Sequence, residues 1–284
     1  MEKTIHIVTD TSCDLPPQLI QEYEIETLPL IVHFGTDTYY DGRLSTDTFW
    51  EKAAQVHPRT SQPSVGMCQD VFERLVAPDK QVLCITITAK HSGTLNSARL
   101  AAQHVDQHIE LFDSLSLSLG LGIQTLQAAQ AARDGRSMQE ILAMLESLRA
   151  RMRVIIVLDT LEYLRRGGRA DAFIAAANRM TRALNIKVII NLVEGRLKLL
   201  SAARSFNGGL KRALKLVEGM GPLEHLAVAH ARRHETAQDV ARRLAERTAF
   251  PLERILVQET GAVLSTHAGP GVIGIVAVPA ILQN

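Results

Sequence analysis

Apolar positions in the first half of the chain form short runs that alternate with stretches of helical spacing. This alternation, without tight hairpins between the runs, predicts crossover connections and a mostly parallel sheet flanked by helices. Ser137 and Glu140 have the spacing of a capping box, which predicts a further helix that continues to residue 150. The expected strands lie at residues 5–8, 83–88, 109–112 and 154–158, and the expected helices lie near residue 49 and at 68–76, 95–101 and 116–133.

The stretch after the first strand has a different pattern. Asp14 precedes Pro16 and Pro17, so we expect a helix that opens at these prolines and is capped by the Asp14 side chain. Apolar residues at every second position over 28–34 predict extended strands or a hairpin that ends by Gly42.

The pattern changes after about residue 160. Runs at 186–193 and 196–203 flank Glu194-Gly195, a two-residue hairpin signal. Later strands alternate with helices, which is typical of an α+β domain. The helices are expected at about 209–218 and 236–248, and the last strand at 272–278.

These patterns predict an α/β protein of two domains. We expect an N-terminal domain over residues 1–160, with a mostly parallel sheet flanked by helices, and a C-terminal α+β domain over residues 161–284, with a mixed sheet. A chain of 284 residues that is 46% hydrophobic is long enough to build two cores of this kind.

Composition narrows the class of protein. The 31 Lys and Arg residues nearly balance the 30 Asp and Glu residues, so the overall charge does not indicate a nucleic acid or an anionic membrane as partner. The three cysteines have no C-x-x-C spacing, which argues against a disulfide framework and a zinc site. No apolar run reaches the roughly 20 residues of a spanning helix, and the amino terminus lacks the regions of a signal peptide. We therefore expect a cytoplasmic protein that binds no metal and does not insert stably into membranes, with transient membrane contact left open.

The segment Ser92-Gly93-Thr94 lies between an expected strand and an expected helix. Its hydroxyl and N–H groups, at the positive end of a helix, are typical of an anion site, although Ser92 or Thr94 could equally serve only as a helix cap. The G-x-x-x-x-G-K-[ST] frame of a nucleotide phosphate site is missing, which favours a small, singly charged group.

A second donor cluster is the segment Thr60-Ser61-Gln62-Pro63-Ser64. It is either a polar loop in which Ser64 caps the following helix, or a set of hydroxyl groups that faces a ligand. The two donor clusters could converge on one carboxylate.

Glycine-rich segments supply further candidates. Gly167 has the position of an ordinary helix C′ residue, whereas Arg169 beyond it could face a ligand or a partner, as could Arg204. His267 lies in a glycine-rich loop from which it could reach a head group. The G-x-G-x-x-G pattern at 269–274 leads into an expected strand, so it does not indicate a dinucleotide site. The arginines at 231–233 and 242–247 are expected on the solvated face of a helix.

Six short segments, taken in order, resemble the DegV family. They are Asp10-Thr11-Ser12, Thr60-Ser61-Gln62-Pro63-Ser64, Ser92-Gly93-Thr94 with Asn96-Ser97-Ala98, Asp113-Ser114, Leu161-Glu162-Tyr163-Leu164 with Gly167-Gly168-Arg169, and His267-Ala268-Gly269-Pro270-Gly271.

The resemblance implies a bacterial, cytoplasmic lipid-binding protein with a long-chain fatty acid in an apolar tunnel at the junction of its domains. Such a protein is not an enzyme and needs no cofactor. It is the subunit that presents the fatty acid carboxylate to an ATP-dependent fatty acid kinase, which forms acyl phosphate for phospholipid metabolism. Val188 and His91 depart from the family pattern, and His91 alters the polarity beside the expected head group.

The resemblance also implies roles for individual residues. Thr60 and Ser92 are expected to hydrogen-bond the carboxylate with help from the Gly93 N–H, with Ser61 and Thr94 in the same site and His267 by the head group. Arg169 and Arg204 are expected on the surface that faces the kinase.

Two other classes of protein stay open at this point. One is a serine hydrolase acting on acyl esters that would use Ser92, His267 and an acid such as Asp10, although the G-x-S-x-G elbow is missing. The other is a regulatory module that binds DNA or protein.

Overall fold

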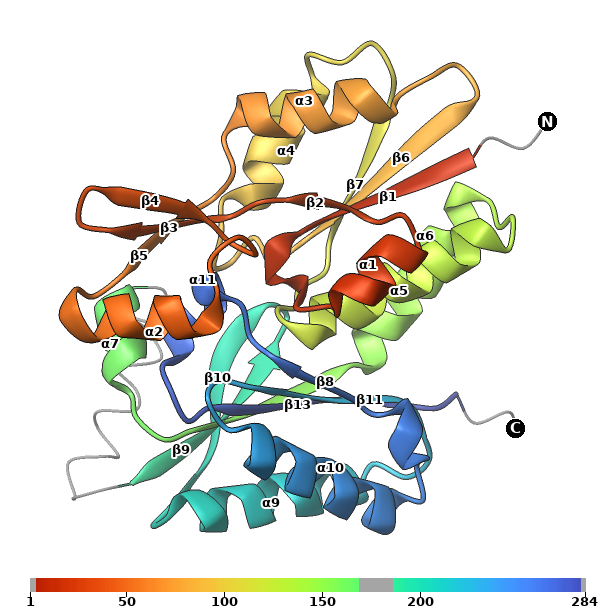
Figure 1. The fold of residues 1–284 in the computed structure, drawn as a ribbon. Coiled ribbons are helices and arrows are strands. Elements are labelled where there is room, and N and C mark those ends of the chain that lie inside the picture. The colour runs from red at the N-terminus through yellow and green to blue at the C-terminus, as the bar shows by residue number, and fades with distance from the viewer. Residues whose placement is uncertain (1–3, 169–185, 282–284) are drawn as a thin grey trace. The chain divides into compact units, whose positions relative to one another are not determined.

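The computed structural model describes residues 4–168 and 186–281 (Figure 1). They form two compact units. The first contains the residues up to 150 together with 261–263, and the second contains the remaining residues.

The first unit is built on a four-stranded parallel sheet with the strand order β2-β1-β6-β7. From β1 the chain adds β2 on one side and later β6 on the other, so the order of strands reverses between β1 and β6. In an open α/β sheet, the carboxyl ends of the strands at such a reversal form the usual ligand-binding position. The strands are β1 (Thr4–Asp10), β2 (Glu26–Leu28), β6 (Lys80–Thr86) and β7 (Ile109–Asp113).

Helices cover both faces of this sheet (Figure 1). α3 (Val65–Leu75) and α4 (Thr94–Ala102) lie on one face, where Val8 and Phe72 belong to one buried core. α1 (Pro17–Glu22) and α5 (Leu119–Arg133) lie on the other face, where the Thr125 hydroxyl donates to Thr9 Oγ1 at 3.2 Å. A short 3-10 helix, η1 (Thr11–Cys13), follows β1, and α6 (Met138–Arg151) follows α5.

A smaller antiparallel sheet, in the order β4-β3-β5, also belongs to the first unit. Gly35, with φ of 61°, forms the hairpin turn, a left-handed conformation that glycine adopts without strain. An apolar cluster fills the space between this sheet and α2, with Phe34 and Phe49 in edge contact at 5.8 Å between ring centroids. The elements are β3 (Ile31–Phe34), β4 (Asp37–Tyr40), α2 (Thr46–Gln55) and β5 (Arg59–Ser61).

The second unit contains a six-stranded mixed sheet in the order β10-β9-β8-β13-β11-β12. Neighbouring strands are antiparallel except for β11 and β12, which are parallel. Glu194 and Gly195 both have positive φ values, 50° and 74°, as a two-residue hairpin turn requires. The strands are β8 (Arg153–Leu158), β9 (Lys187–Val193), β10 (Arg196–Ala203), β11 (Leu223–His230), β12 (Leu256–Glu259) and β13 (Ile273–Pro279).

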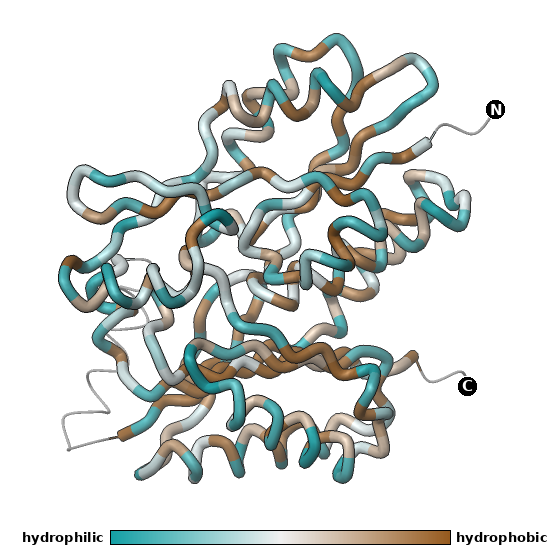
Figure 2. The backbone as a smooth tube through the Cα atoms, viewed as in Figure 1, coloured by the Kyte–Doolittle hydropathy of each residue, from teal (hydrophilic) through white to brown (hydrophobic). Residues whose placement is uncertain are grey.

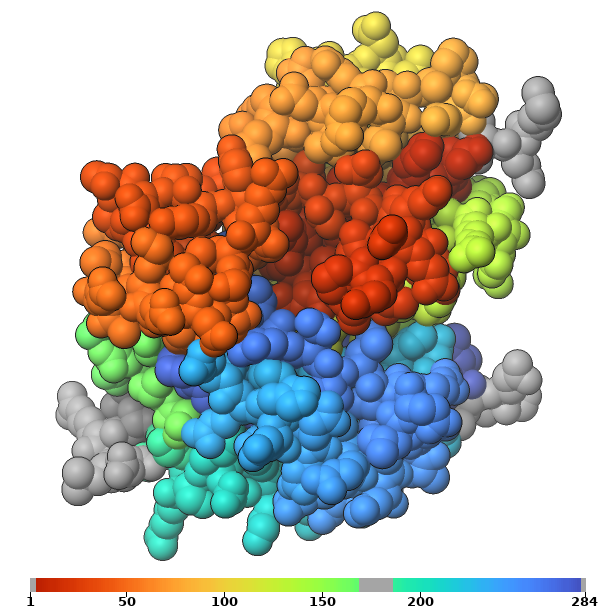
Figure 3. All heavy atoms as spheres, in the orientation of Figure 1, coloured from red at the N-terminus to blue at the C-terminus, as the bar shows by residue number. Residues whose placement is uncertain are grey.

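α9 (Phe206–Glu218) and α10 (His234–Thr248) pack on one face of this sheet through a buried core that includes Leu214, Val240 and Ile275. Figure 2 shows apolar residues concentrated along β8, β11 and β13 and polar residues on the outer sides of the two helices. In the space-filling view, the side chains of α9 and α10 form part of the outer surface of this unit (Figure 3). The remaining elements are α7 (Glu162–Gly167), η2 (Leu252–Arg254) and α11 (Ala262–Ala268).

The predicted fold class is confirmed: a parallel sheet with helices in the N-terminal part and a mixed sheet in the C-terminal part. The capping box is also observed, since the Ser137 N–H donates to Glu140 Oε2 at 2.8 Å. The strand at 154–158 differs from the expectation. It is β8, which pairs antiparallel with β9 and β13, because its partners come from later parts of the chain and not from the parallel sheet.

Asp14 does not cap α1, which begins after Pro16 without a side-chain cap. Asp14 instead has φ of 50° and turns into the interior of the first unit. None of the helices in the described ranges is long and apolar enough to cross a bilayer.

Candidate functional site

The loops that follow β1, β6 and β7 are tied together at the carboxyl edge of the parallel sheet. Asp10, at the end of β1, accepts a hydrogen bond from the Ile87 N–H at 2.7 Å. The Thr88 N–H donates to the Ser116 carbonyl at 2.9 Å, and the Ala89 N–H donates to the Asp113 carboxylate at 3.3 Å. These bonds fix the segment between β6 and α4 at the reversal of strand order, where α/β sheets bind ligands.

The turn that enters α4 carries the predicted anion donors. Gly93 is the N-cap residue, so no side chain caps the helix, and its first turn contains no acidic residue. Ser92 Oγ and Thr94 Oγ1 lie 2.8 Å apart, and the Thr94 N–H makes only a long bond, 3.3 Å, to Ser92 Oγ. In the parts of the chain that the structure describes, the Gly93 N–H has no hydrogen-bond partner. The positive end of a nine-residue helix therefore presents two hydroxyls and an open N–H group.

The second donor segment lies beside this turn. The Gln62 carboxamide covers Gly93 so closely that a Cβ atom at position 93 would lie 2.8 Å from Gln62 Nε2. Thr60 is opposite Val32 in β3, whereas Ser61 is opposite Ile31, so the two hydroxyls point to opposite faces of the small sheet.

Gln62, the residue after β5, is the one whose contact with Gly93 is observed. It precedes Pro63 and is therefore biased to an extended backbone. Ser61 has another neighbour: its Oγ lies 2.9 Å from Nε2 of His33, whose Nδ1 lies 3.1 Å from Thr38 Oγ1. The structure thus brings Gln62 to the Ser92–Thr94 turn and places Ser61 in a hydrogen-bonded row with His33.

Three buried carboxylates lie in the same unit. Asp14 accepts hydrogen bonds from the Ser118 hydroxyl at 2.5 Å and from the Gly261 N–H at 2.8 Å, and Asp41 accepts one from the Ala262 N–H at 3.0 Å. Burial raises the pKa of Asp14 to about 7 and those of Asp10 and Asp41 to about 6, against the opposing effect of these hydrogen bonds. Repulsion between like charges adds to this effect: Asp41 raises the pKa of Asp10, and both Asp41 and Asp10 raise the pKa of Asp14.

The environment of Asp10 bears on the hydrolase alternative. One of its carboxylate oxygens accepts from the backbone and side chain of Ser12, and the other accepts from the Ile87 N–H. Asp10 is fully buried in these contacts. It holds the loop after β6 in place, and neither oxygen is directed at a histidine as in a catalytic triad.

His267 belongs to the second unit. It lies in the last turn of α11, not in the expected loop, because the left-handed glycines begin only at Gly269. Its ring packs on Gly167, where a Cβ atom would overlap Nδ1. Gly269 is equally close to Tyr163 of α7, with 2.5 Å between a Cβ at position 269 and the ring.

These contacts explain the glycines of the Gly167-Gly168 pair. Gly168, with φ of 64°, is the left-handed residue that ends α7, so it has the role expected of Gly167. Gly167 makes room for the His267 ring.

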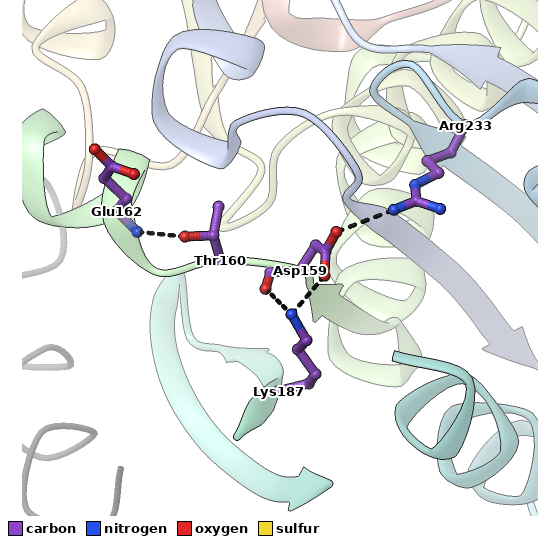
Figure 4. A network of polar contacts seen from close by, with 5 residues as sticks. All are labelled: Asp159, Thr160, Glu162, Lys187 and Arg233. Atoms are coloured by element: carbon purple, nitrogen blue, oxygen red, sulfur yellow. Dashed lines mark hydrogen bonds and ion pairs between the residues drawn. The ribbon is translucent and has the colours of Figure 1, made fainter. Parts of the chain in front are cut away.

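A polar network supports the start of α7 (Figure 4). Lys187 Nζ donates to both the carbonyl and the carboxylate of Asp159 at 2.7 Å, and the Arg233 guanidinium donates to the second carboxylate oxygen at 3.0 Å. Partial burial alone would raise the pKa of Asp159, but the bonds to Lys187 and Arg233 lower it. The Thr160 hydroxyl, one residue before the N-cap residue Leu161, accepts from the Glu162 N–H at 3.1 Å.

The arginines have different environments. Arg233 was expected on a solvated face, but its guanidinium stacks on Phe206 at 5.1 Å and binds Asp159. Arg242 and Arg243 do lie on the exposed side of α10, each paired with Asp239. Arg204, just before α9, is exposed, and Arg169 lies outside the described residues.

Across the ranges that the structure describes, no cluster of three or more His, Cys, Asp or Glu side chains is arranged to hold a metal ion.

Sequence reasoning missed Gln62 and the Asp14–Asp41 pair. Gln62 was quoted only as part of a polar segment, and its position over Gly93 depends on the packing of α3 against α4. No local pattern marks Asp14 or Asp41, because their contacts at Gly261 and Ala262 join segments more than 200 residues apart.

Comparison with known proteins gives consistent matches over the full chain. A sequence profile described as "Uncharacterised protein, DegV family" matches residues 4–280. A DegV domain-containing protein of Caldanaerobacter subterraneus subsp. tengcongensis is 31% identical over 281 residues, which is 97% of this chain and 98% of that protein.

Two solved structures resemble the fold closely. A DegV family protein from Thermus thermophilus, described in terms of its fatty acid binding, has a TM-score of 0.86 and 31% identity, covering 98% of this chain and 100% of that one. A stearic acid-binding protein from Eubacterium ventriosum has a TM-score of 0.85 and 26% identity, covering 97% of this chain and 98% of that one.

Proposed function

Since this chain belongs to the DegV family, we propose that it binds a long-chain fatty acid through the carboxylate head group. The observation that carries the proposal is the turn at the start of α4, where Ser92, Thr94 and the open Gly93 N–H offer donors without a neighbouring acid. The relatives from Thermus thermophilus and Eubacterium ventriosum, described as fatty acid-binding, support the choice of ligand.

The chemistry of these donors suits a carboxylate. A carboxylate has two oxygens that each accept hydrogen bonds, and each bond to a charged group contributes about 1.5 to 3 kcal/mol. In this proposal Ser92, Thr94 and the Gly93 N–H bind the head group together with Thr60. Ser61 contributes through its bond to His33, and His267 lies by the head group.

The alkyl tail supplies most of the affinity. Burial of each CH₂ group contributes about 0.8 kcal/mol, so roughly 14 methylenes contribute on the order of 11 kcal/mol before the cost of association. Aromatic residues make up only 4% of the chain against 46% hydrophobic residues in total. Aliphatic side chains therefore wall the proposed tunnel, and such walls accept a flexible chain without demanding a ring stack.

We further propose that the protein is a non-catalytic carrier of the fatty acid. It hides the tail and presents the carboxylate to an ATP-dependent kinase, which transfers phosphate to form acyl phosphate for phospholipid synthesis. Arg204 and Arg169 lie on the surface that meets this kinase. No cofactor takes part on the carrier.

The first test is the ligand itself. Native mass spectrometry of the purified protein, followed by denaturing extraction, should release a species with the mass of a long-chain fatty acid. After removal of this lipid, calorimetric titration with palmitate should restore a one-to-one complex. Delipidated protein that fails to bind any long-chain fatty acid would refute the proposal.

The second test is the site. Ser92→Ala removes one hydroxyl donor and should weaken palmitate binding about 10-fold, because one hydrogen bond to a charged group is lost. Ser147→Ala, at an exposed position of α6, is the matched control and should bind as the native protein does. Equal affinity of the Ser92→Ala variant and the native protein would remove Ser92 from the site.

A further inference from the structure

The backbone of Gln62 is held in place on both sides, whereas its side chain is exposed. Its backbone is held between β5, which ends at Ser61, and α3, whose first turn is capped by Ser64 Oγ accepting from the Met67 N–H at 3.2 Å. The Gln62 side chain is exposed, and within the described ranges its carboxamide makes no hydrogen bond to another residue.

The carboxamide nevertheless has a defined position. A Cβ atom at Gly93 would lie 2.8 Å from Gln62 Nε2, 2.9 Å from Cδ and 3.2 Å from Oε1, so the flat amide group lies over the Gly93 backbone. Gly93 has φ of −83°, a value that any residue adopts, so glycine is not required there by backbone conformation. What the missing side chain provides is the space that the Gln62 amide occupies.

The position of the amide matters because of its neighbours. Gly93 carries the open N–H at the start of α4, and Ser92 Oγ and Thr94 Oγ1 lie beside it. An anion bound at this turn would lie near the Gln62 carboxamide, because that amide packs against Gly93 itself. An amide donates through Nε2 and carries no charge, so it adds a hydrogen bond to an anion without competing for the hydroxyl donors.

We propose that the Gln62 carboxamide donates a hydrogen bond to the carboxylate bound at the start of α4 and selects an ionised head group over a neutral one. This assignment rests on the proposed fatty acid binding and adds a specificity-determining residue to that site. A neutral head group gains little from the amide, since a hydrogen bond to an uncharged partner contributes less than one to a carboxylate.

The experiment compares two ligands with the same tail. Delipidated protein is titrated with palmitate and with hexadecanol at one pH at which palmitate is ionised. Gln62→Met keeps the length of the side chain but removes the donor, and Gln62→Glu keeps its shape but places a negative charge beside the carboxylate. Gln55→Glu, at an exposed position of α2, is the control for the change in net charge.

Palmitate affinity should fall about 10-fold for Gln62→Met and about 100-fold for Gln62→Glu, whereas hexadecanol affinity should be unchanged in both. Gln55→Glu should bind both ligands as the native protein does. Circular dichroism melting of each variant verifies that the fold is intact.

Three other outcomes would overturn the assignment. If palmitate binds both Gln62 variants with native affinity, the amide is not a ligand. If palmitate and hexadecanol lose affinity equally, Gln62 acts on the tail or on the fold and not on the charge. If the native protein binds neither ligand, the proposed function fails and the role of Gln62 with it, a result distinct from the first two.

Discussion

Three buried carboxylates make the stability of the first unit depend on pH. Asp14, Asp10 and Asp41 accept hydrogen bonds from backbone N–H groups and hydroxyls, yet no cation is paired with them in the described ranges. Burial therefore dominates and raises the pKa of each group above 3.8. A carboxyl group whose pKa is higher in the folded than in the unfolded chain binds more protons when folded, so acid favours folding.

This linkage predicts the effect of Asp14→Asn. The pKa of Asp14 rises from 3.8 to about 7, so its contribution to the free energy of unfolding is lost as pH rises through this window. Asparagine does not titrate. The native protein should therefore lose stability relative to the variant between pH 4 and pH 7, with a limiting slope of about 1.4 kcal/mol per pH unit, and the difference should level off above that window.

Urea unfolding of both proteins at several pH values measures this difference. Asp106→Asn removes an exposed carboxylate and controls for the change in net charge. Parallel stability curves for the native protein and Asp14→Asn would show that Asp14 does not carry the linkage.

The helix α9 has one apolar face that packs against the mixed sheet and one face that is exposed to solvent. In α9 the apolar positions recur with helical spacing, and the helix buries Leu210, Ala213, Leu214 and Val217 against the mixed sheet. Leu216, in the same helix, is 40% exposed, whereas Leu214 is fully buried. The two leucines are the same residue type in the same helix, so substituting each in turn measures the effect of burial on the free energy of unfolding.

We expect Leu214→Ala to lower the free energy of unfolding by about 2 to 5 kcal/mol, because a cavity replaces a packed side chain. Leu216→Ala should change it by less than about 0.5 kcal/mol, as exposed substitutions generally do. Chemical denaturation followed by circular dichroism gives both values. Similar losses for the two variants would mean that the two leucines do not differ in burial in solution.

The positions of helices and strands could be predicted from the sequence more readily than the pairing of the strands. Periodicity located the helices and strands well, because each element buries one face and local caps such as Ser137 with Glu140 mark its start. Pairing between strands was harder. β8 has the apolar run of a parallel strand, but its partners β9 and β13 come later in the chain and decide its direction.

Side chains with distant partners were the hardest to assign. Asp14 looked like a cap for the next helix, but it binds Gly261, a residue that no local pattern connects to it. Arg233 looked solvated, although Phe206 and Asp159 hold it. The hydroxyl groups at Ser92 and Thr60 were recognisable because each belongs to a polar segment just before a helix, whereas the position of Gln62 over Gly93 emerges only from tertiary packing.

The whole molecule is nearly neutral, with a net charge of +1, so long-range attraction does not select its partners. Recognition of a kinase would instead depend on local exposed charges. Arg204 is such a group: it is exposed between β10 and α9, and in the described part of the chain it takes part in no ion pair. An exposed, unpaired arginine is available to a carboxylate or phosphate group of a partner.

Reversal of this charge should separate lipid binding from delivery to the kinase. Arg204→Glu should bind palmitate with native affinity, but its acyl phosphate formation with an ATP-dependent fatty acid kinase should fall at least about 10-fold at low salt and less at high salt, because salt screens exposed charges. Arg196→Glu makes the same change at the opposite, equally exposed end of β10 and should leave the rate unaltered. Phosphate transfer from labelled ATP measures the rate, and calorimetry measures palmitate affinity. Loss of palmitate affinity in Arg204→Glu would place Arg204 in the lipid site, and equal rates for the two variants would exclude it from the kinase surface.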